Sequence, residues 1–185
     1  MLNVRFDPFP VLETDRLTLH ALTQENAGDM FLLRSNVAAM KFIGKPLLTS
    51  LYDAERLIDV YMFNLQEKMG ITWGITLKSE SNGLVGTIGF HKLDKPNFRA
   101  EIGYLLHPDQ WNKGIMNEAI KSVLNYGFLE MGLHSVEGRI HPENIPSSRI
   151  LIKNGFLKEA YFKEAFYSEG KFLDTEVYSL LTPFT

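Results

Sequence analysis

The segment that decides the fold is EIGYLLHPDQWNKGIMNEAIKSVLNYGF, from Glu101 to Phe128. Its first part, 101–106, alternates and is rich in Ile, Tyr and Leu, which predicts a β-strand. Pro108 interrupts that strand, because proline has no N–H group for a sheet ladder. From Ile115 the apolar residues recur with the helical period. The segment therefore predicts a strand, a polar turn that contains Gly114, and a helix.

A glycine-containing turn in front of a helix can bind phosphate. The first turn of a helix has unpaired N–H groups and the positive end of the helix dipole. Gly114 would let a ligand approach the backbone, and Lys113 adds a mobile positive charge. A tight turn ahead of a core helix would use the same glycine, and on these two residues alone that plainer interpretation is favoured. Neither G-x-x-x-x-G-K-[ST] nor G-x-G-x-x-G is present.

The run Trp111-Asn112-Lys113-Gly114-Ile115 after a strand resembles the acetyl-coenzyme A pyrophosphate loop of the GNAT N-acetyltransferases. The most similar form is W-G-K-G-I-A, in the branch that acetylates the N-termini of ribosomal proteins. This chain has Asn112 where Gly is usual, and asparagine tolerates left-handed backbone angles. It has the bulkier Met116 where Gly or Ala is usual, which bears on how closely a pyrophosphate can approach. The resemblance implies that the cofactor-binding residues are Leu105, Leu106, His107, Trp111, Asn112, Lys113, Gly114, Ile115 and Met116, with Asn144 and Ser147.

A second signature lies in NIPSSRILIKNGF, residues 144–156. It matches the N-x-x-S/A and K-x-G-F pattern of the same family at every position of the pattern. Asn144 can cap the following helix or reach an amide of the cofactor's pantetheine arm, and both alternatives stay open. The resemblance implies that Ser147 is the hydroxyl nearest the thiol. A simple helix-start serine is the alternative.

Composition predicts one globular domain over residues 1–185. The chain is 45% hydrophobic and 22% charged, which is ordinary for a soluble protein. The net charge of −3, with both signs interspersed, argues against a nucleic-acid-binding protein. The absence of cysteine excludes disulfides, thiolate nucleophiles and cysteine zinc sites. No signal-peptide core and no apolar run of about 18 residues is present, so we expect a cytoplasmic protein without a membrane partner.

The order of elements predicts a mixed α/β (α+β) fold. Strands are expected at 16–22, 71–78, 84–91, 98–106, 134–140, 156–162 and 171–181. Helices are expected at 24–34, 51–68 and 146–153, and from Ile115 to a stop at Met131-Gly132-Leu133. This is a single-domain GNAT fold with a twisted, mostly antiparallel sheet of about seven strands and about four helices. The step from 98–106 to 134–140 should be parallel, with a right-handed crossover. Asn82-Gly83 and the stretch 168–170 predict hairpin turns.

The two helices at 24–34 and 51–68 would form a flap over the acceptor site, by the same resemblance. The aromatic residues Phe42, Tyr52, Tyr61 and Phe63 can line a pocket there, although packing in the core is the more common role for such residues. The opening LETDRL, residues 12–17, also resembles this branch. We interpret Arg16 within it as a partner in a surface ion pair.

The resemblance implies direct attack by an amine on acetyl-coenzyme A, with a carboxylate as base. Glu101 is the first candidate, and it shares a strand face with Gly103 and Leu105. Glu137, in the run Val136-Glu137-Gly138-Arg139, is the second. For each, an exposed strand carboxylate without a catalytic role is the alternative. No H-x-x-H or H-E-x-x-H motif is present, so no catalytic metal is expected.

Two functions follow from these residues. The first is an N-acetyltransferase that uses acetyl-coenzyme A and acts on a protein N-terminus or on an amine-bearing small molecule, as a monomer or homodimer. The second is a non-catalytic acyl-coenzyme A-binding or regulatory module on the same fold. The departures at Asn112 and Met116 motivate the second hypothesis.

Overall fold

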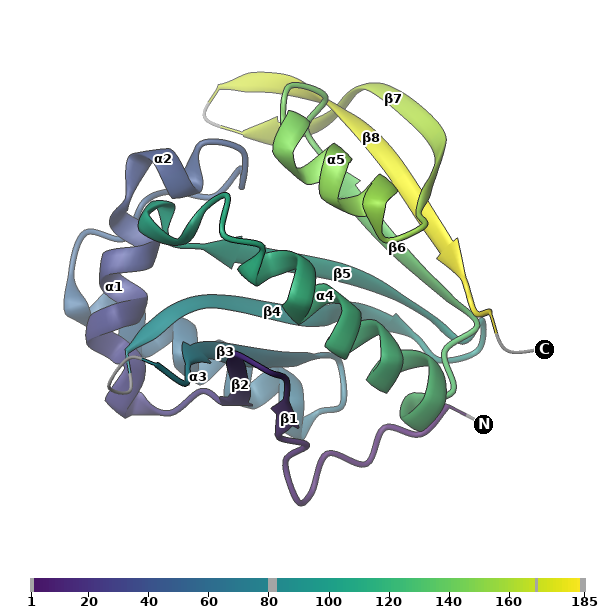
Figure 1. Cartoon of the computed structure of the whole chain (residues 1–185). Helices are drawn as coiled ribbons and strands as arrows, with labels where there is room; N and C mark the ends of the chain where they lie inside the picture. Colours follow the sequence, from purple (N-terminus) through teal and green to yellow (C-terminus); the bar gives the residue numbers. More distant parts are fainter. Residues whose placement is uncertain (1, 80–82, 169, 184–185) are drawn as a thin grey trace.

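The structure, a computed structural model, describes residues 2–79, 83–168 and 170–183. One twisted sheet runs through the chain, and helices lie on both of its faces (Figure 1). The strands are β1 (Leu12–Glu13), β2 (Leu17–Ala21), β3 (Ile71–Leu77), β4 (Leu84–Asp94), β5 (Arg99–Leu106), β6 (Ser135–Ile140), β7 (Leu157–Ser168) and β8 (Lys171–Leu181). The helices are α1 (Ala27–Ser35), α2 (Val37–Met40), α3 (Leu51–Gln66), α4 (Ile115–Asn125) and α5 (Ile145–Lys153). Two 3₁₀ turns, η1 (Gln24–Asn26) and η2 (Pro108–Gln110), and a π-helical segment, η3 (Tyr126–Met131), complete the chain.

The order along the sheet is β1-β2-β3-β4-β5-β6-β8-β7. Neighbouring strands are antiparallel except for β5 and β6, which are parallel. This confirms the predicted fold class and the predicted parallel step from β5 through α4 to β6. The described residues hold eight strands instead of about seven, because the two-residue β1 pairs with β2. They hold five α-helices instead of about four, because α2 forms a helix of its own.

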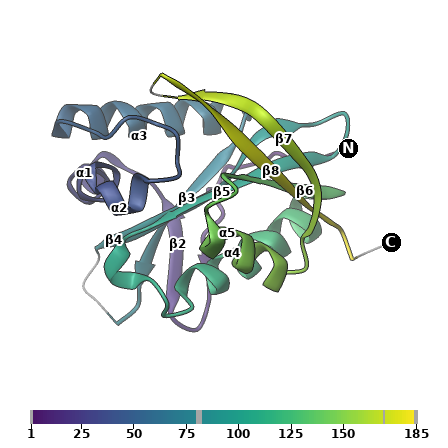
Figure 2. The same cartoon turned by 90° about the horizontal axis from the view of Figure 1, so that it is seen from above.

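The helices divide between the two faces of the sheet. Figure 2 shows α1, α2 and α3 on one face and α4 and α5 on the other. The strands β3 and β4 between them are buried along most of their length, since both faces are covered. The main core is built around Trp73 and Phe90, whose rings meet edge to face with centroids 6.3 Å apart. A smaller core lies between α1 and α3, around Met30 and Ile58.

The helix α4 carries the strongest amphipathic pattern and buries the stripe that its sequence predicts. Met116, Ala119, Ile120, Val123 and Leu124 are all buried. The helical run continues past Phe128 as the π-helical η3 to Met131, and it ends at Gly132 with φ +75°, where the stop was predicted. The α-carbon of Gly127 lies against the ring of Phe90, where a Cβ would be 2.6 Å from Cζ. The absence of a side chain at that position lets the end of this helix pack closely on β4.

Two strands are longer than predicted. The strand β4 continues past His91 to Asp94, with a register shift between these residues. The strand β7 runs to Ser168 instead of ending at Phe162, and its register shifts between Phe162 and Phe166. A bulge of this kind breaks the alternation on which the prediction depended. Of the two predicted hairpin turns, Asn82 in the first and Glu169 in the second lie outside the described residues. Within the described ranges, no helix is both long and apolar enough to cross a membrane.

Candidate active site

The second half of the loop between β5 and α4 presents backbone N–H groups that have no partner among the described residues. Two of its residues, Asn112 with φ +60° and Gly114 with φ +77°, take left-handed backbone angles. The N–H groups from Asn112 to Met116 donate no hydrogen bond within the described part of the chain. Trp111 anchors the loop, because its Nε1–H donates to the carbonyl of Leu106 over 2.9 Å. The result is a set of free donors at the positive end of α4, which is the geometry that binds phosphate.

Both departures from the family's loop sequence have a structural explanation. The left-handed angle at Asn112 is one that asparagine adopts more readily than most residues. The side chain of Met116 is 6% exposed and packs in the main core, so it does not lie over the free N–H groups. Leu106 is also buried in this core, and Leu105 packs in a small cluster beside α1 and α2. These three residues can therefore contact a ligand at the loop chiefly through their backbone.

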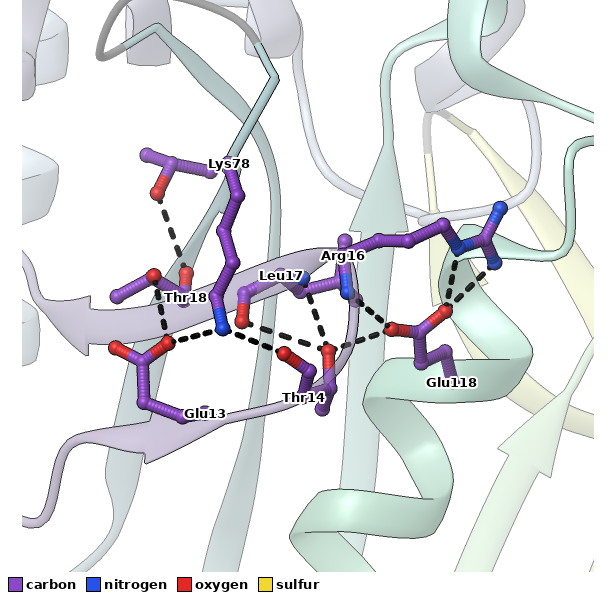
Figure 3. A network of polar contacts seen from close by, with 8 residues as sticks. Glu13, Thr14, Arg16, Leu17, Thr18, Lys78 and Glu118 are labelled. Carbon is purple, nitrogen blue, oxygen red and sulfur yellow. Dashed lines mark hydrogen bonds and ion pairs between the residues drawn. The ribbon is translucent and has the colours of Figure 1, made fainter.

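A network of charged residues holds the loop against β2 (Figure 3). The guanidinium of Arg16 donates from Nη1 to the carbonyl of Lys113 over 2.9 Å. Its Nη2 lies 2.6 Å from Glu118 Oε2 and its Nε donates to the same oxygen over 2.7 Å. The other oxygen of Glu118 accepts from Thr14 Oγ1 at 2.5 Å and from the backbone N–H of Arg16 at 3.0 Å. The ion pair expected of Arg16 is present, and it supports the loop at the start of α4.

The parallel strands β5 and β6 pair over three residues only and then separate. The paired positions are Arg99 with Ser135, Ala100 with Val136, and Glu101 with Glu137. From Ile102 to Leu106, β5 pairs with β4 alone among the described residues, and β6 continues along β8. The start of α5 lies on the far side of this opening (Figure 1). The split thus begins at the two candidate bases and leads toward the free N–H groups of the loop.

Two hydroxyl groups meet near the start of α5. The side chain of Asn144 caps this helix, because its Oδ1 accepts from the backbone N–H of Ser147 at 3.3 Å. The Tyr104 hydroxyl is buried and has no hydrogen-bond partner among the described residues. Burial raises the pKa of Tyr104 to about 12, and the neighbouring hydroxyl of Ser147 acts in the opposite direction. Leu151, one turn further into α5, is fully buried in the core.

Sequence reasoning missed Tyr104 although a signal was present. Strand alternation separates Ile102, Tyr104 and Leu106 from Glu101, Gly103 and Leu105. Ile102 and Leu106 are buried in the main core that α4 and α5 help to form, so Tyr104 shares their face. A tyrosine on a face that helices cover needs a partner for its hydroxyl, and that requirement could have marked it as a site residue.

The two candidate bases differ in what surrounds them. The carboxylate of Glu101 lies 2.7 Å from Lys92 Nζ and 3.8 Å from Arg139 Nε. The carboxylate of Glu137 makes short ion pairs with both Arg99 and Arg139. Burial raises the pKa of Glu137, but the hydrogen bonds and charges of these two arginines outweigh burial and hold its pKa below the ordinary value. A carboxylate held in its charged form by two cations accepts a proton less readily than the same group in water.

Glu101 faces a cavity of about 710 Å³. Its walls are the loop after α2, the ends of β4 and β6, and the hairpin of β7 and β8. His91 lies on the wall next to Glu101, and burial lowers its pKa, so its imidazole is neutral at pH 7. Of the aromatic residues named from sequence, Phe42 lines this cavity and Tyr61 packs on the smaller core, whereas Tyr52 and Phe63 are exposed.

Comparisons with known proteins agree with this geometry. Residues 16–157 match the family described as acetyltransferase (GNAT) domain. The chain is 39% identical over 175 residues to YoaA of Bacillus subtilis, an uncharacterised N-acetyltransferase, and the match covers 95% of this chain and 98% of that protein. A solved structure of a GNAT-family acetyltransferase from Bacillus anthracis is 29% identical and covers 93% of this chain and 98% of that one, with a TM-score of 0.82.

The fold is also that of RimL, a ribosomal L7/L12 alpha-N-protein acetyltransferase solved in complex with coenzyme A. That structure has a TM-score of 0.81 at 19% identity, and the match covers 93% of this chain and 98% of that one. The family that the two sequence signatures resemble is confirmed. The chain therefore belongs to the GNAT acetyltransferase family and is an acetyltransferase.

Proposed function

We propose that the chain, as one domain over residues 1–185, transfers an acetyl group from acetyl-coenzyme A to a primary amine on a protein N-terminus or a small molecule. One observation carries this proposal. The split between β5 and β6 has free N–H donors on one side and a carboxylate that faces a cavity on the other. The fold shared with a ribosomal-protein acetyltransferase supports a protein N-terminus as one acceptor.

The residues of the loop fit the pyrophosphate of coenzyme A. Five successive N–H groups, from Asn112 to Met116, are free to donate, and the two left-handed residues turn the backbone outward. Lys113 adds a positive charge, and its Nζ makes one hydrogen bond, to the Gln110 side chain at 3.1 Å. The edge of β5 from Ile102 to Leu106 that faces away from β4 would pair with the pantetheine amides. When bound, acetyl-coenzyme A would supply the acetyl group as a thioester.

Glu101 is the base in this proposal. An α-amine has a pKa of about 7.7–8.0, so at neutral pH it must lose a proton before it can attack a carbonyl carbon. Glu101 Oε2 lies in the cavity wall with Lys92 as its close cation, whereas both oxygens of Glu137 are already in ion pairs with arginines. Glu137 instead fixes Arg139 beside Glu101. The proton from the amine would pass to Glu101 directly or through one water molecule.

Ser147 and Tyr104 would serve the leaving group. Cleavage of the thioester leaves a negative charge on sulfur, which a hydroxyl can stabilise by donating a hydrogen bond or a proton. The Ser147 hydroxyl lies at the start of α5, where the helix dipole also favours negative charge. The Tyr104 hydroxyl is free to donate to Ser147 and so to orient it. Ser147 would contact the reacting atoms, and Tyr104 would position Ser147.

The non-catalytic alternative has no support in the loop geometry. Asn112 adopts the angle that the turn requires, and Met116 is buried away from the free N–H groups. The two departures that motivated this alternative therefore leave the loop's donors in place.

The first experiment measures thermal stability with and without acetyl-coenzyme A. A ligand at 100 times its Kd adds about 2.7 kcal/mol, which for a chain of this size raises Tm by about 5 °C or more. Coenzyme A should give a similar shift, and adenine nucleotides without the pantetheine arm should give a smaller one. The absence of any shift at millimolar acetyl-coenzyme A would contradict the proposal.

The second experiment follows thiol release with a set of primary amines. Glu101→Gln should lower kcat by about 10²–10⁴-fold without changing the thermal shift by coenzyme A. Glu159→Gln is the matched control, because Glu159 is exposed on β7 and loses the same charge. Equal activity of Glu101→Gln and the parent would exclude Glu101 as the base.

A further inference from the structure

The cavity in front of Glu101 is positively charged, although the chain carries a net charge of −3. Five cationic side chains line it, namely Lys41, Lys45, Lys92, Arg139 and Lys171. Three carboxylates line it, namely Glu101, Glu143 and Asp174. The described lining residues therefore carry a surplus of two positive charges. Behind the wall, Glu137 and Arg99 form an ion pair with each other and leave this surplus unchanged.

The cations without an ion pair lie at the outer end of the cavity. At the inner end, Lys92 pairs with Glu101, and Arg139 pairs with Glu137 and lies 3.8 Å from Glu101. At the outer end, Lys41 and Lys45 on the loop after α2 make no ion pair within the described residues, nor does Lys171 on the hairpin of β7 and β8. The ammonium group of Lys41 lies 4.8 Å from the ring centroid of Phe42, which keeps it beside the cavity.

The carboxylates at the outer end do not cancel these lysines completely. The oxygens of Asp174 accept from the Tyr161 hydroxyl and from the backbone N–H of Glu164. Glu143 also lines the cavity and makes no ion pair within the described residues. Three lysines thus face two carboxylates, which leaves one positive charge at this end.

The walls between the lysines are aromatic and hold the two sides together. Phe42 stacks on His141, with centroids 5.5 Å apart and an angle of 24° between the rings. Across the cavity, the Phe166 ring of the hairpin packs against Gly44, where a Cβ would be 2.4 Å from Phe166 Cε1. These contacts fix the loop with Lys41 and Lys45 close to the hairpin with Lys171. The three lysines therefore border one cavity instead of lying on separate surfaces.

We infer that the acceptor of this acetyltransferase is an amine that also bears a negatively charged group, a carboxylate or a phosphate, which Lys41, Lys45 and Lys171 bind while the amine reaches Glu101. This inference rests on the proposed function, since it names the class of its acceptor. A polyamine would place cations against cations and is disfavoured. An acidic peptide and a small phosphorylated amine share the required chemistry.

Matched pairs of amines test this inference. One pair is a peptide with aspartates after its N-terminal serine and the same peptide with asparagines. The other is phosphoethanolamine and ethanolamine, and spermidine is a cationic reference. The anionic member of at least one pair should have a kcat/KM about 10-fold higher, equivalent to about 1.4 kcal/mol. A preference within the peptide pair indicates a peptide acceptor, and a preference within the phosphoethanolamine pair indicates a small-molecule acceptor. The preference should shrink at high salt, because exposed charges are screened.

Variants of the lysines provide the second arm. Lys41→Gln combined with Lys45→Gln should remove most of the preference through KM and leave the KM for acetyl-coenzyme A unchanged. Lys45→Glu should favour the neutral member of the pair. Lys121→Gln, on the exposed face of α4, is the control for a lost positive charge and should behave as the parent. An equal or higher kcat/KM for neutral or cationic amines in the parent would overturn the inference.

The two proposals fail in different ways. If coenzyme A does not stabilise the protein, the acetyltransferase proposal itself is wrong. If coenzyme A binds but no amine of the panel reacts, the change in Tm of the protein–coenzyme A complex on adding each amine measures how tightly that amine binds. Tighter binding of the anionic members then supports the inference, and equal binding overturns it.

Discussion

Glu118 should stabilise the protein only while its carboxyl group is ionised. Its side chain is 20% exposed and accepts hydrogen bonds from Thr14 and Arg16, and Arg16 in turn holds the carbonyl of Lys113. Glu118→Gln keeps the size of the side chain but removes the ion pair. Hydrogen bonds to charged groups contribute about 1.5–3 kcal/mol when buried, and exposed ion pairs contribute about 0–1 kcal/mol. Because Arg16 is 49% exposed, we expect a loss of about 1.5 kcal/mol.

The folded-state pKa of Glu118 determines the pH range in which its stabilisation is lost. Burial raises the pKa of Glu118, but the hydrogen bonds from Thr14 and Arg16 outweigh burial, and its pKa in the folded state is lowered. A lowered pKa means that the stabilisation is complete above the unfolded pKa of about 4.3 and is lost as the pH falls through the folded pKa. The difference between parent and variant should be full at pH 7 and should shrink below about pH 4.

Thermal unfolding followed by circular dichroism measures this difference. A loss of about 1.5 kcal/mol corresponds to a decrease in Tm of about 3–6 °C for a chain of this length. Glu159→Gln, which removes the same charge from an exposed position on β7, should change Tm by less than about 1 °C. The reasoning is refuted if Glu118→Gln unfolds at the parent's temperature at pH 7. It is also refuted if the difference persists unchanged at the lowest pH at which the parent unfolds cooperatively.

Two further substitutions probe the site. Gly114→Ala places a Cβ 3.5 Å from Arg16 Nη2, which is no clash, so the cost of the substitution is the backbone strain at φ +77°, about 1–2 kcal/mol. We expect a lower Tm and, by calorimetry, a higher Kd for coenzyme A. An unchanged Kd would show that the loop does not bind the cofactor. Tyr104→Phe removes a buried hydroxyl that has no partner among the described residues, so Tm should stay equal or rise while kcat falls with KM unchanged. An unaltered kcat would mean that the Tyr104 hydroxyl does not position Ser147.

The local pattern of the sequence predicted the elements that form the site. The change from strand to helical period between Glu101 and Phe128 gave β5, the loop and α4 at their observed places. The parallel step to β6 followed from the intervening helix. These features depend on residues close together in the chain, which is why periodicity and turn chemistry could predict them.

The features that complete the site depend on distant residues. Pairing between β5 and β6 ends at Glu101 although both strands continue, and nothing in either strand marks that position. Arg16 and Glu118 are 102 positions apart, so their contact is visible only in the fold. The neutralisation of Glu137 by Arg99 likewise depends on a crossover between two strands. Sequence reasoning could therefore name both glutamates but could not tell that two arginines surround Glu137.

The brief contact between β5 and β6 has a consequence for the order of events in catalysis. The side chains of Glu101 and Tyr104 leave β5 on opposite faces, so the acceptor cavity and the start of α5 approach the split from opposite sides. Two reactants that arrive from opposite sides of a sheet do not compete for one entrance, and neither has to depart before the other arrives. Under the proposed function, this architecture favours a ternary complex, in which the amine and the acetyl donor are bound together, over a relay in which the enzyme carries the acetyl group between them.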